Sequence, residues 1–196
     1  IRPTPARRVY QKAELQQQLL TISTHSIGRA DPDRYTGEVM ATILGDSAGS
    51  RLYWGVREQG LAESAESEVL SFDGVGMALS MATTSPDLAP ACYRAIQAEL
   101  ARLQADGVAE DELARAKTKL ASRVVMDGES TNRRMLALIG SWLALGRLET
   151  LEEVVARIEA VRAADIRGLL DRLPLTERQV LVALGPVDEA TLLGDA

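Results

Sequence analysis

Three glutamates near the middle of the chain, Glu63, Glu66 and Glu68, have the residue type and spacing that acid–base or metal chemistry uses. Glu66 and Glu68 stand two residues apart in a predicted strand, so their side chains project from the same face. A catalytic metal or a proton relay normally adds an imidazole or another well-placed partner to such carboxylates. The surrounding sequence offers neither, and we expect Glu66 and Glu68 to form a solvated strand face.

The histidine and cysteine content limits the chemistry further. His25 is the only histidine and lies in a predicted strand, whereas a catalytic zinc usually takes three protein ligands with histidine prominent. Cys92 is the only cysteine, so no internal disulfide forms, and it falls on the apolar stripe of a predicted helix. Nucleophile-elbow, phosphate-loop and dinucleotide motifs are absent from the sequence. We expect no catalytic residue, metal ligand or cofactor in this chain.

Local patterns predict the elements that position these residues. Asp73-Gly74 separates two strands, 63–72 and 75–83, and favours a hairpin with a tight primed turn. Before it, Gly45 is expected to close a helix in the left-handed conformation, and Ser47 or Ser50 to open a short helix that Gly60 ends. β-branched residues and helical spacing predict strands over 16–27 and 179–184, and helices over 31–45, 85–107, 110–127, 131–146, 152–161 and 163–173.

Two expectations about burial follow from the side-chain pattern. In strand 75–83 large residues alternate with small ones, and we expect the large face to fill the core and the small face to admit a close neighbour. The helix over 131–146 is apolar on most sides and is expected to be deeply buried. Strands separated by helix pairs predict an α+β fold, with a largely antiparallel sheet and helices packed on one side.

Composition indicates one soluble domain. The chain has 196 residues, 46% of them hydrophobic and 26% charged, and its net charge of -6 argues against a nucleic-acid partner. The apolar run 135–146 is shorter than the roughly 20 residues of a membrane helix. The Pro-rich start predicts a linker or leading segment over 1–13, followed by a single domain over 14–196 cut from a longer parent chain. The expected location is cytoplasmic or periplasmic if the source is bacterial.

Four stretches carry a resemblance to a known family. Gly49-Ser50-Arg51-Leu52, followed by Val56-Arg57-Glu58 and Gly60-Leu61-Ala62, is similar to its "SSRL, REK, GLAY" run. The others, in order, are Glu112 to Lys117 ("ELxxAK"), Glu129-Ser130 ("ES"), and Arg157 to Val161 with Asp165-Ile166 and Leu184-Gly185-Pro186. In this order and spacing the chain resembles the C-terminal, non-zinc half of the pitrilysin, insulysin and mitochondrial processing peptidase group of zinc metallopeptidases.

The resemblance implies a peptide-binding, non-catalytic domain that closes a substrate chamber opposite a zinc-bearing domain. Family members that cut peptides hold zinc through an HxxEH motif, which this chain lacks, so it is expected to be inactive alone and zinc is expected on an N-terminal domain or partner subunit. The family contacts substrate through an Arg and a Tyr in this region. Arg57 matches the Arg, and Glu63 stands where the Tyr is expected; a carboxylate cannot donate as a phenol does.

Two alternatives to this function remain open. The chain is a catalytically inactive partner subunit that needs a zinc-bearing mate, or it is a purely structural relative. Glu63 in place of Tyr favours the inactive subunit. An HxxEH motif in the parent polypeptide would favour the two-domain peptidase.

Overall fold

The computed structural model describes residues 4–194, which contain one five-stranded sheet in the order β1-β5-β2-β4-β3. Antiparallel pairing joins β5 to β2, β2 to β4 and β4 to β3, while β1 runs parallel to β5. The largely antiparallel sheet of the sequence prediction is therefore confirmed. The strands are Ala6–Gln11 (β1), Gln18–Ser26 (β2), Ser64–Ser71 (β3), Gly76–Thr84 (β4) and Val180–Gly185 (β5).

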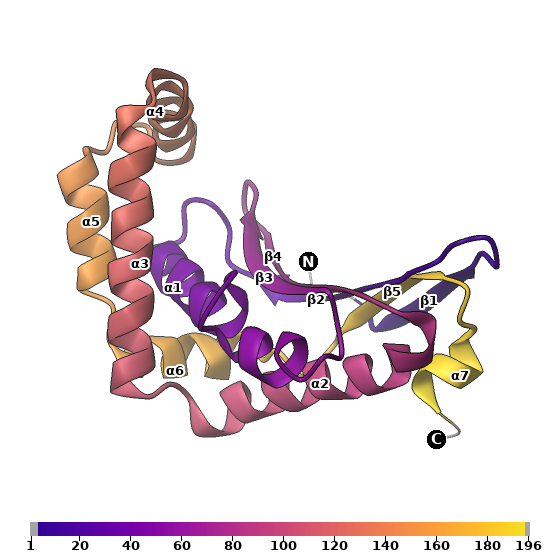
Figure 1. The fold of residues 1–196 in the computed structure, drawn as a ribbon. Coiled ribbons are helices and arrows are strands. Elements are labelled where there is room, and N and C mark those ends of the chain that lie inside the picture. Colours follow the sequence, from indigo (N-terminus) through magenta and orange to yellow (C-terminus); the bar gives the residue numbers. More distant parts are fainter. Residues whose placement is uncertain (1–3, 195–196) are drawn as a thin grey trace.

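Helices cover one face of the sheet, as predicted. In Figure 1, α2 runs beneath the sheet, while α3, α4 and α5 stand together as an arm at its side. No helix within residues 4–194 has both the length and the apolar composition to cross a bilayer. The helices are α1 (Arg34–Gly45), a π-helical turn η1 (Tyr53–Arg57), a 3-10 turn η2 (Pro86–Leu88), α2 (Ala89–Asp106), α3 (Glu110–Glu129), α4 (Thr131–Leu145), α5 (Leu151–Glu159), α6 (Ala163–Arg172) and α7 (Glu189–Leu193).

The small face of β4 admits close neighbours, as expected, but the prediction that its large face fills the core was wrong. Its small residues are buried beneath the helices, with Ala78 at 8% and Ala82 at 4% exposure, whereas Met77 is 38% exposed. Small side chains let the helices approach the sheet closely, so the core lies on that side. The large residues instead stand on the open face, which they share with Leu19 of β2 and Val182 of β5.

The stretch between α1 and β3 is arranged as predicted at Ser50 and Gly60 but not at Gly45. Ser50 Oγ accepts from the backbone N–H of Tyr53 at 3.2 Å, and Gly60 has a φ of +71°. Gly45 is not left-handed; a Cβ added there would come within 2.2 Å of the backbone nitrogen of Ser67. The reason for this glycine is therefore the close contact between α1 and β3.

The predicted hairpin is confirmed, but its turn is not a primed one. The backbone N–H of Phe72 donates to the carbonyl oxygen of Val75 at 2.8 Å, which closes the β3–β4 loop. Gly74 has a φ of +76°, whereas Asp73 does not have a positive φ. A primed turn requires a positive φ at its first central residue, so Asp73-Gly74 makes a different tight turn between the same strands.

Helix α4 differs most from the sequence expectation. The break before it falls at Ser130, whose Oγ accepts from the N–H of Arg133 at 3.5 Å, rather than at Asp127-Gly128. No residue of Thr131–Leu145 is buried, so the prediction of deep burial was wrong. Apolar composition favours burial of a helix, but it did not determine the burial of this one.

Part of the predicted linker is a strand. Residues 6–11 form β1 and pair in register with β5, from Ala6 beside Val180 to Gln11 beside Gly185. This pairing satisfies the backbone groups that β5 would otherwise leave free on that edge. Residues 1–3 of the same predicted segment lie outside the described range, and the domain limits 14–196 stay a prediction.

Candidate functional site

The stretches that carry the family resemblance are tied together in space. Arg51 makes a two-pronged contact with Glu112, with Nε to Oε1 at 3.0 Å and Nη2 to Oε2 at 2.8 Å, and it also donates to the carbonyl oxygen of Gly107 at 2.7 Å. Lys117 Nζ donates to the carbonyl oxygen of Val161 at 2.9 Å. The stretch that contains Arg51 is thus joined to the stretch Glu112 to Lys117, and that stretch is joined to Arg157 to Val161. These residues hold helices together.

Arg57, the first predicted substrate contact, lies exposed on η1. Its guanidinium sits 5.7 Å from the centre of the Tyr53 ring and reaches the carbonyl oxygen of Ser47 at 3.5 Å. Neither contact neutralises the charge of Arg57. The guanidinium is therefore free to contact a carbonyl or carboxylate of another molecule.

Glu63, the second predicted substrate contact, is exposed just before β3. Its Oε2 accepts from Gln17 Nε2 at 2.7 Å, and its backbone N–H donates to the carbonyl oxygen of Thr83. Arg57 and Glu63 thus have different partners, and no hydrogen bond or ion pair joins their side chains within residues 4–194. The two predicted residues do not form a preassembled pair.

The donor set does not fit a zinc centre within the described residues. His25 on β2 lies opposite Met77 of β4, and residues 4–194 hold no group of three or more His, Cys, Asp or Glu side chains placed to share a metal ion. Glu66 and Glu68 are exposed, as expected of a solvated strand face. Burial raises the pKa of the Cys92 thiol to about 11, so this residue stays protonated at neutral pH.

A cavity of about 400 Å³ lies between α1, α3, α4 and α5. Its apolar walls come from Val124 of α3, Leu138 of α4 and Val154 of α5. Its polar lining combines arginines with acids, contributed by Arg29, Arg34, Arg133, Arg134, Glu38, Asp127 and Glu149. Pockets of roughly 300–1,000 Å³ with apolar walls and a few convergent polar groups are the usual binding sites of small ligands.

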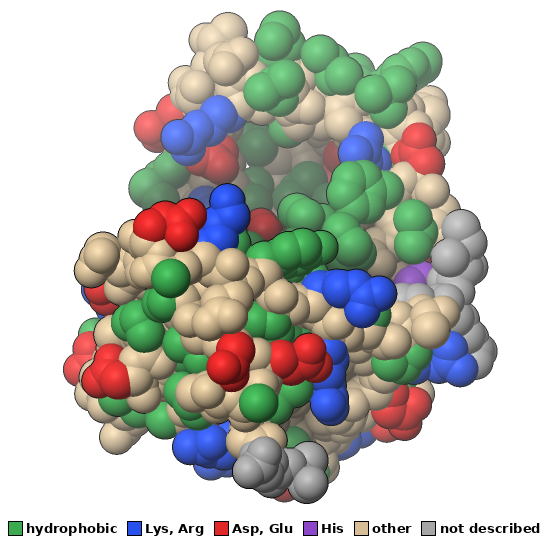
Figure 2. Space-filling model, turned by 90° about the vertical axis from the view of Figure 1, so that its right-hand side faces the viewer, with side chains coloured by type: hydrophobic (Ala, Val, Ile, Leu, Met, Phe, Trp, Pro, Cys, Tyr) green, Lys and Arg blue, Asp and Glu red, His purple; other side chains and the backbone are tan. Residues whose placement is uncertain are grey.

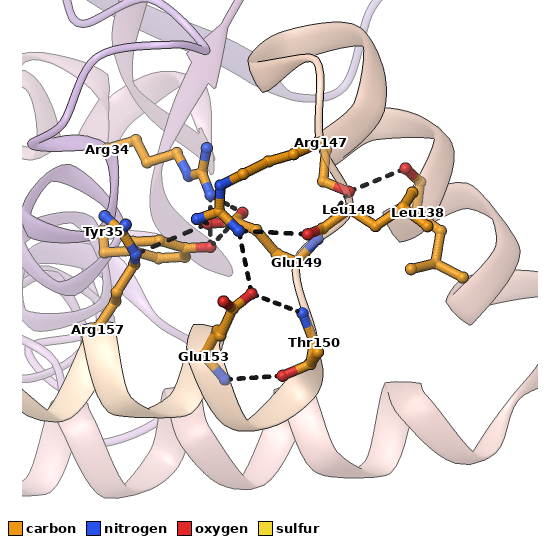
Figure 3. Close-up of polar contacts among 10 residues, drawn as sticks. Arg34, Tyr35, Leu138, Arg147, Leu148, Glu149, Thr150, Glu153 and Arg157 are labelled. Atoms are coloured by element: carbon orange, nitrogen blue, oxygen red, sulfur yellow. Dashed lines mark hydrogen bonds and ion pairs between the residues drawn. The ribbon is translucent and has the colours of Figure 1, made fainter.

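A buried carboxylate organises one wall of this cavity (Figure 3). Glu149 forms an ion pair with Arg34, accepts from the hydroxyl of Tyr35 at 3.1 Å, and lies 3.3 Å from Arg147 Nη2 and 3.7 Å from Arg157 Nε. Burial raises the pKa of Tyr35. The cluster connects α1 to the loop after α4 and to α5. Since hydrogen bonds and ion pairs already engage Glu149, its role is structural.

Sequence reasoning missed this cluster. Glu149 follows Arg147 in a short connection, while Arg34 and Tyr35 lie more than 110 residues earlier. The only local signal nearby was Thr150 followed three residues later by Glu153, a capping box that both hydrogen bonds complete in the structure. That signal locates the start of α5 but not the cavity.

The face of α4 turned away from the cavity is apolar and exposed. In Figure 2 hydrophobic side chains gather at the top of the molecule, where α4 lies, and line the hollow beneath it. A face of this composition is typical of a surface that another protein covers. We call it the outer stripe of α4; its residues are Met135 (49% exposed), Leu136 (57%), Ile139 (47%), Trp142 (58%) and Leu143 (68%).

These features define a helix-covered α+β domain, and its described residues include no group of three or more His, Cys, Asp or Glu side chains that could share a metal ion. The chain belongs to the family described as the peptidase M16 inactive domain, whose model matches residues 1–120. Among curated proteins, the chain is 30% identical over 180 residues to a Bacillus subtilis protein named as an uncharacterized zinc protease, YmxG. It is 31% identical over 173 residues to the similarly named SCO5738 of Streptomyces coelicolor. These matches confirm the family predicted from the four motifs.

The relatives are longer than this chain. The matches cover 91% and 87% of the chain but only 44% and 38% of the two relatives. Among solved structures, a peptidase M16 inactive domain from Pseudomonas fluorescens aligns with a TM-score of 0.80 at 20% identity, over 95% of this chain and 44% of that one. A chain of complex III2 from Candida albicans aligns with a TM-score of 0.85, also at 20% identity, over 97% of this chain and 47% of that one. At such identity the structures show the fold alone.

Proposed function

We propose that this chain is the peptide-binding, non-catalytic half of a zinc metalloendopeptidase and that it closes the substrate chamber opposite a zinc-bearing half. Membership of the inactive-domain family supports a non-catalytic role for this half, because its curated relatives are named as zinc proteases and exceed this chain in length. The zinc belongs to the other half.

The observation that carries the proposal is the outer stripe of α4. Five large apolar side chains on one helix are about half exposed or more. Contact of so much apolar surface with water is unfavourable and is typical of a surface that binds another protein. Covering them with a second domain would bury apolar surface at roughly 25 cal/mol per Å². The stripe therefore docks on the zinc-bearing half and leaves the hollow beneath α4 facing inward.

Two exposed tryptophans give a matched test of docking. Trp142 in the outer stripe and Trp54 in η1 are 58% and 59% exposed. Trp142→Asp should abolish or strongly weaken the complex of this chain with its zinc-bearing half, measured by light scattering after mixing the two. Trp54→Asp should leave it intact. Equal complex formation by both variants would rule out docking through α4.

Peptide contact is assigned to Arg57 and Glu63. Arg57 carries a charge without an acid partner, and a guanidinium can hold a peptide carbonyl or steady a developing oxyanion. Arg57→Ala should lower peptide turnover by the assembled enzyme about tenfold or more without changing the thermal midpoint of the chain. Glu63→Tyr should raise turnover, since a phenol donates where a carboxylate only accepts. Wild-type turnover by Arg57→Ala would remove Arg57 from the site.

A further inference from the structure

The cavity between α1, α3, α4 and α5 is built entirely by this chain and has two distinct kinds of lining. One face of α4, opposite its outer stripe, contributes Ala137, Leu138 and Ala144, and α5 contributes Leu151 and Val154. The polar lining combines arginines and acids with the neutral side chains of Tyr35, Ser71, Ser141 and Thr150. A ligand that is apolar over much of its length and charged at one end fits this combination.

The ion pairs among the lining residues indicate whether the charged end of the ligand is positive or negative. Arg34 is neutralised by Glu149, and Arg133 forms an ion pair with Asp127. Arg29 and Arg134 also line the cavity, but their guanidinium groups form no hydrogen bond or ion pair with any residue between 4 and 194. Arg134 has only a longer-range electrostatic interaction with Glu152, which does not line the cavity. Arg29 is half-buried, so its charge has lost part of its water without gaining a partner.

Glu38 is the remaining acid of the lining. Glu38 has an exposed side chain and also borders a second cavity farther along the same face of α1. The charged groups that act on it are Arg34 and Glu149, so Glu38 is not a partner of Arg29. Four arginines face three acids, which leaves an excess of one positive charge even with Glu38 ionised. The unpaired groups of the cavity are thus guanidiniums, and a carboxylate is the ligand group that pairs with them in two-pronged geometry.

We propose that this cavity binds an aliphatic group that ends in a carboxylate, with the chain along α4 and α5 and the carboxylate at Arg29 and Arg134. Two sources supply that chemistry: a free aliphatic acid, or the C-terminal residue of a peptide. The proposed site does not rest on the proposed peptidase function, because the lining residues on which it is argued belong to this chain.

Isothermal titration of the whole 196-residue chain tests the proposal, using decanoate and an N-acetylated peptide that ends in leucine. Decylamine and the C-terminally amidated peptide are the matched probes without the carboxylate. We expect at least one carboxylate to bind and its counterpart to bind at least tenfold more weakly. If decanoate binds and the peptide does not, the ligand class is free aliphatic acids. If the peptide binds, the ligand class includes the C-terminal residues of peptides. Failure of both carboxylates, or equal binding of the counterparts, would overturn the proposal.

Variants separate a specific site from general adhesion to the apolar surface. Arg29→Gln should weaken the carboxylate about tenfold or more, and since Arg29 has no partner its loss should not unfold the chain. Arg94→Gln, which removes an exposed arginine of α2, should bind as wild type. A Cβ added at Gly140 meets no atom within 4 Å, so Gly140→Leu should fill the cavity and abolish binding while Gly140→Ala preserves it. Full binding by Gly140→Leu would place the ligand elsewhere.

Discussion

Arg51, which precedes η1, and Glu112 in the first turn of α3 form a two-pronged ion pair, with side chains only 13% and 24% exposed. Arg51 also donates to the carbonyl oxygen of Gly107, so one guanidinium fixes both the end of α2 and the start of α3. Its third nitrogen, Nη1, is buried without a partner within residues 4–194. The geometry requires a planar guanidinium at this position.

Arg51→Lys should therefore destabilise the chain although it keeps the charge. An ammonium cannot make both contacts with Glu112 and also reach Gly107, and we expect the free energy of unfolding to fall by about 1–2 kcal/mol in chemical denaturation. The exposed pair Arg115–Asp111 of α3 provides the control, since Arg115→Lys should leave the unfolding midpoint unchanged. Equal effects of the two substitutions would contradict the structural role of Arg51.

The same pair predicts an acid-labile contribution to stability. The hydrogen bonds from Arg51 lower the pKa of Glu112 below its ordinary value in the folded chain. A lowered folded-state pKa gives stability that is complete above the unfolded pKa of about 4.3 and is lost as pH falls through that region toward the folded value. Glu112→Gln should thus have a lower midpoint than wild type at pH 7, and the difference should shrink between about pH 5 and pH 3. A difference that stays constant with pH would exclude this linkage.

Removing the charge of Glu149 should cost more than removing any exposed acid. Glu149→Gln leaves Arg34 partly buried without its carboxylate, and we expect a loss of about 3 kcal/mol. Glu159→Gln, an exposed acid of α5, is the matched control and should be neutral. The double variant Arg34→Met with Glu149→Leu should be more stable than Glu149→Gln, because no uncompensated charge remains. The unfolding free energies of the variants check this.

The start of α3 lacks a side-chain cap. Ala109 occupies the cap position with extended backbone angles, φ -80° and ψ 151°, and has no side-chain acceptor. Ala109→Thr should raise the free energy of unfolding by about 1 kcal/mol, by supplying an acceptor for an amide of the first turn. Ala109→Val adds similar volume without the hydroxyl and should not stabilise. An unchanged midpoint for the threonine variant would argue against this cap.

Features set by neighbouring residues were predictable from the sequence. The hairpin at Asp73-Gly74, the cap at Ser50 and the buried position of Cys92 each depend on a few residues close in the chain, and the structure has all three. Burial was less predictable: Met77 and Trp142 are apolar but exposed. Apolar patterning shows which residues favour burial, but packing within residues 4–194 leaves these two side chains exposed.

The candidate site was largely beyond the sequence. Arg57 and Glu63 came from the family resemblance, and the structure shows their positions without testing their roles. No sequence pattern around Glu149 predicts its ion pairs, because Arg34 lies on α1 and Arg157 lies on α5. Long-range ion-pair clusters depend on how elements pack, and no local period or motif encodes that packing.

The burial of Cys92 makes this chain convenient for spectroscopy. The sequence contains one thiol, which is fully buried and has a pKa of about 11, so maleimide at neutral pH should leave it unmodified. A cysteine placed on α4 would then carry a single fluorophore or spin label without prior removal of the native one. Probes at the two sides of the hollow would test the proposed docking, because a change in their separation on mixing with a zinc-bearing half would report it.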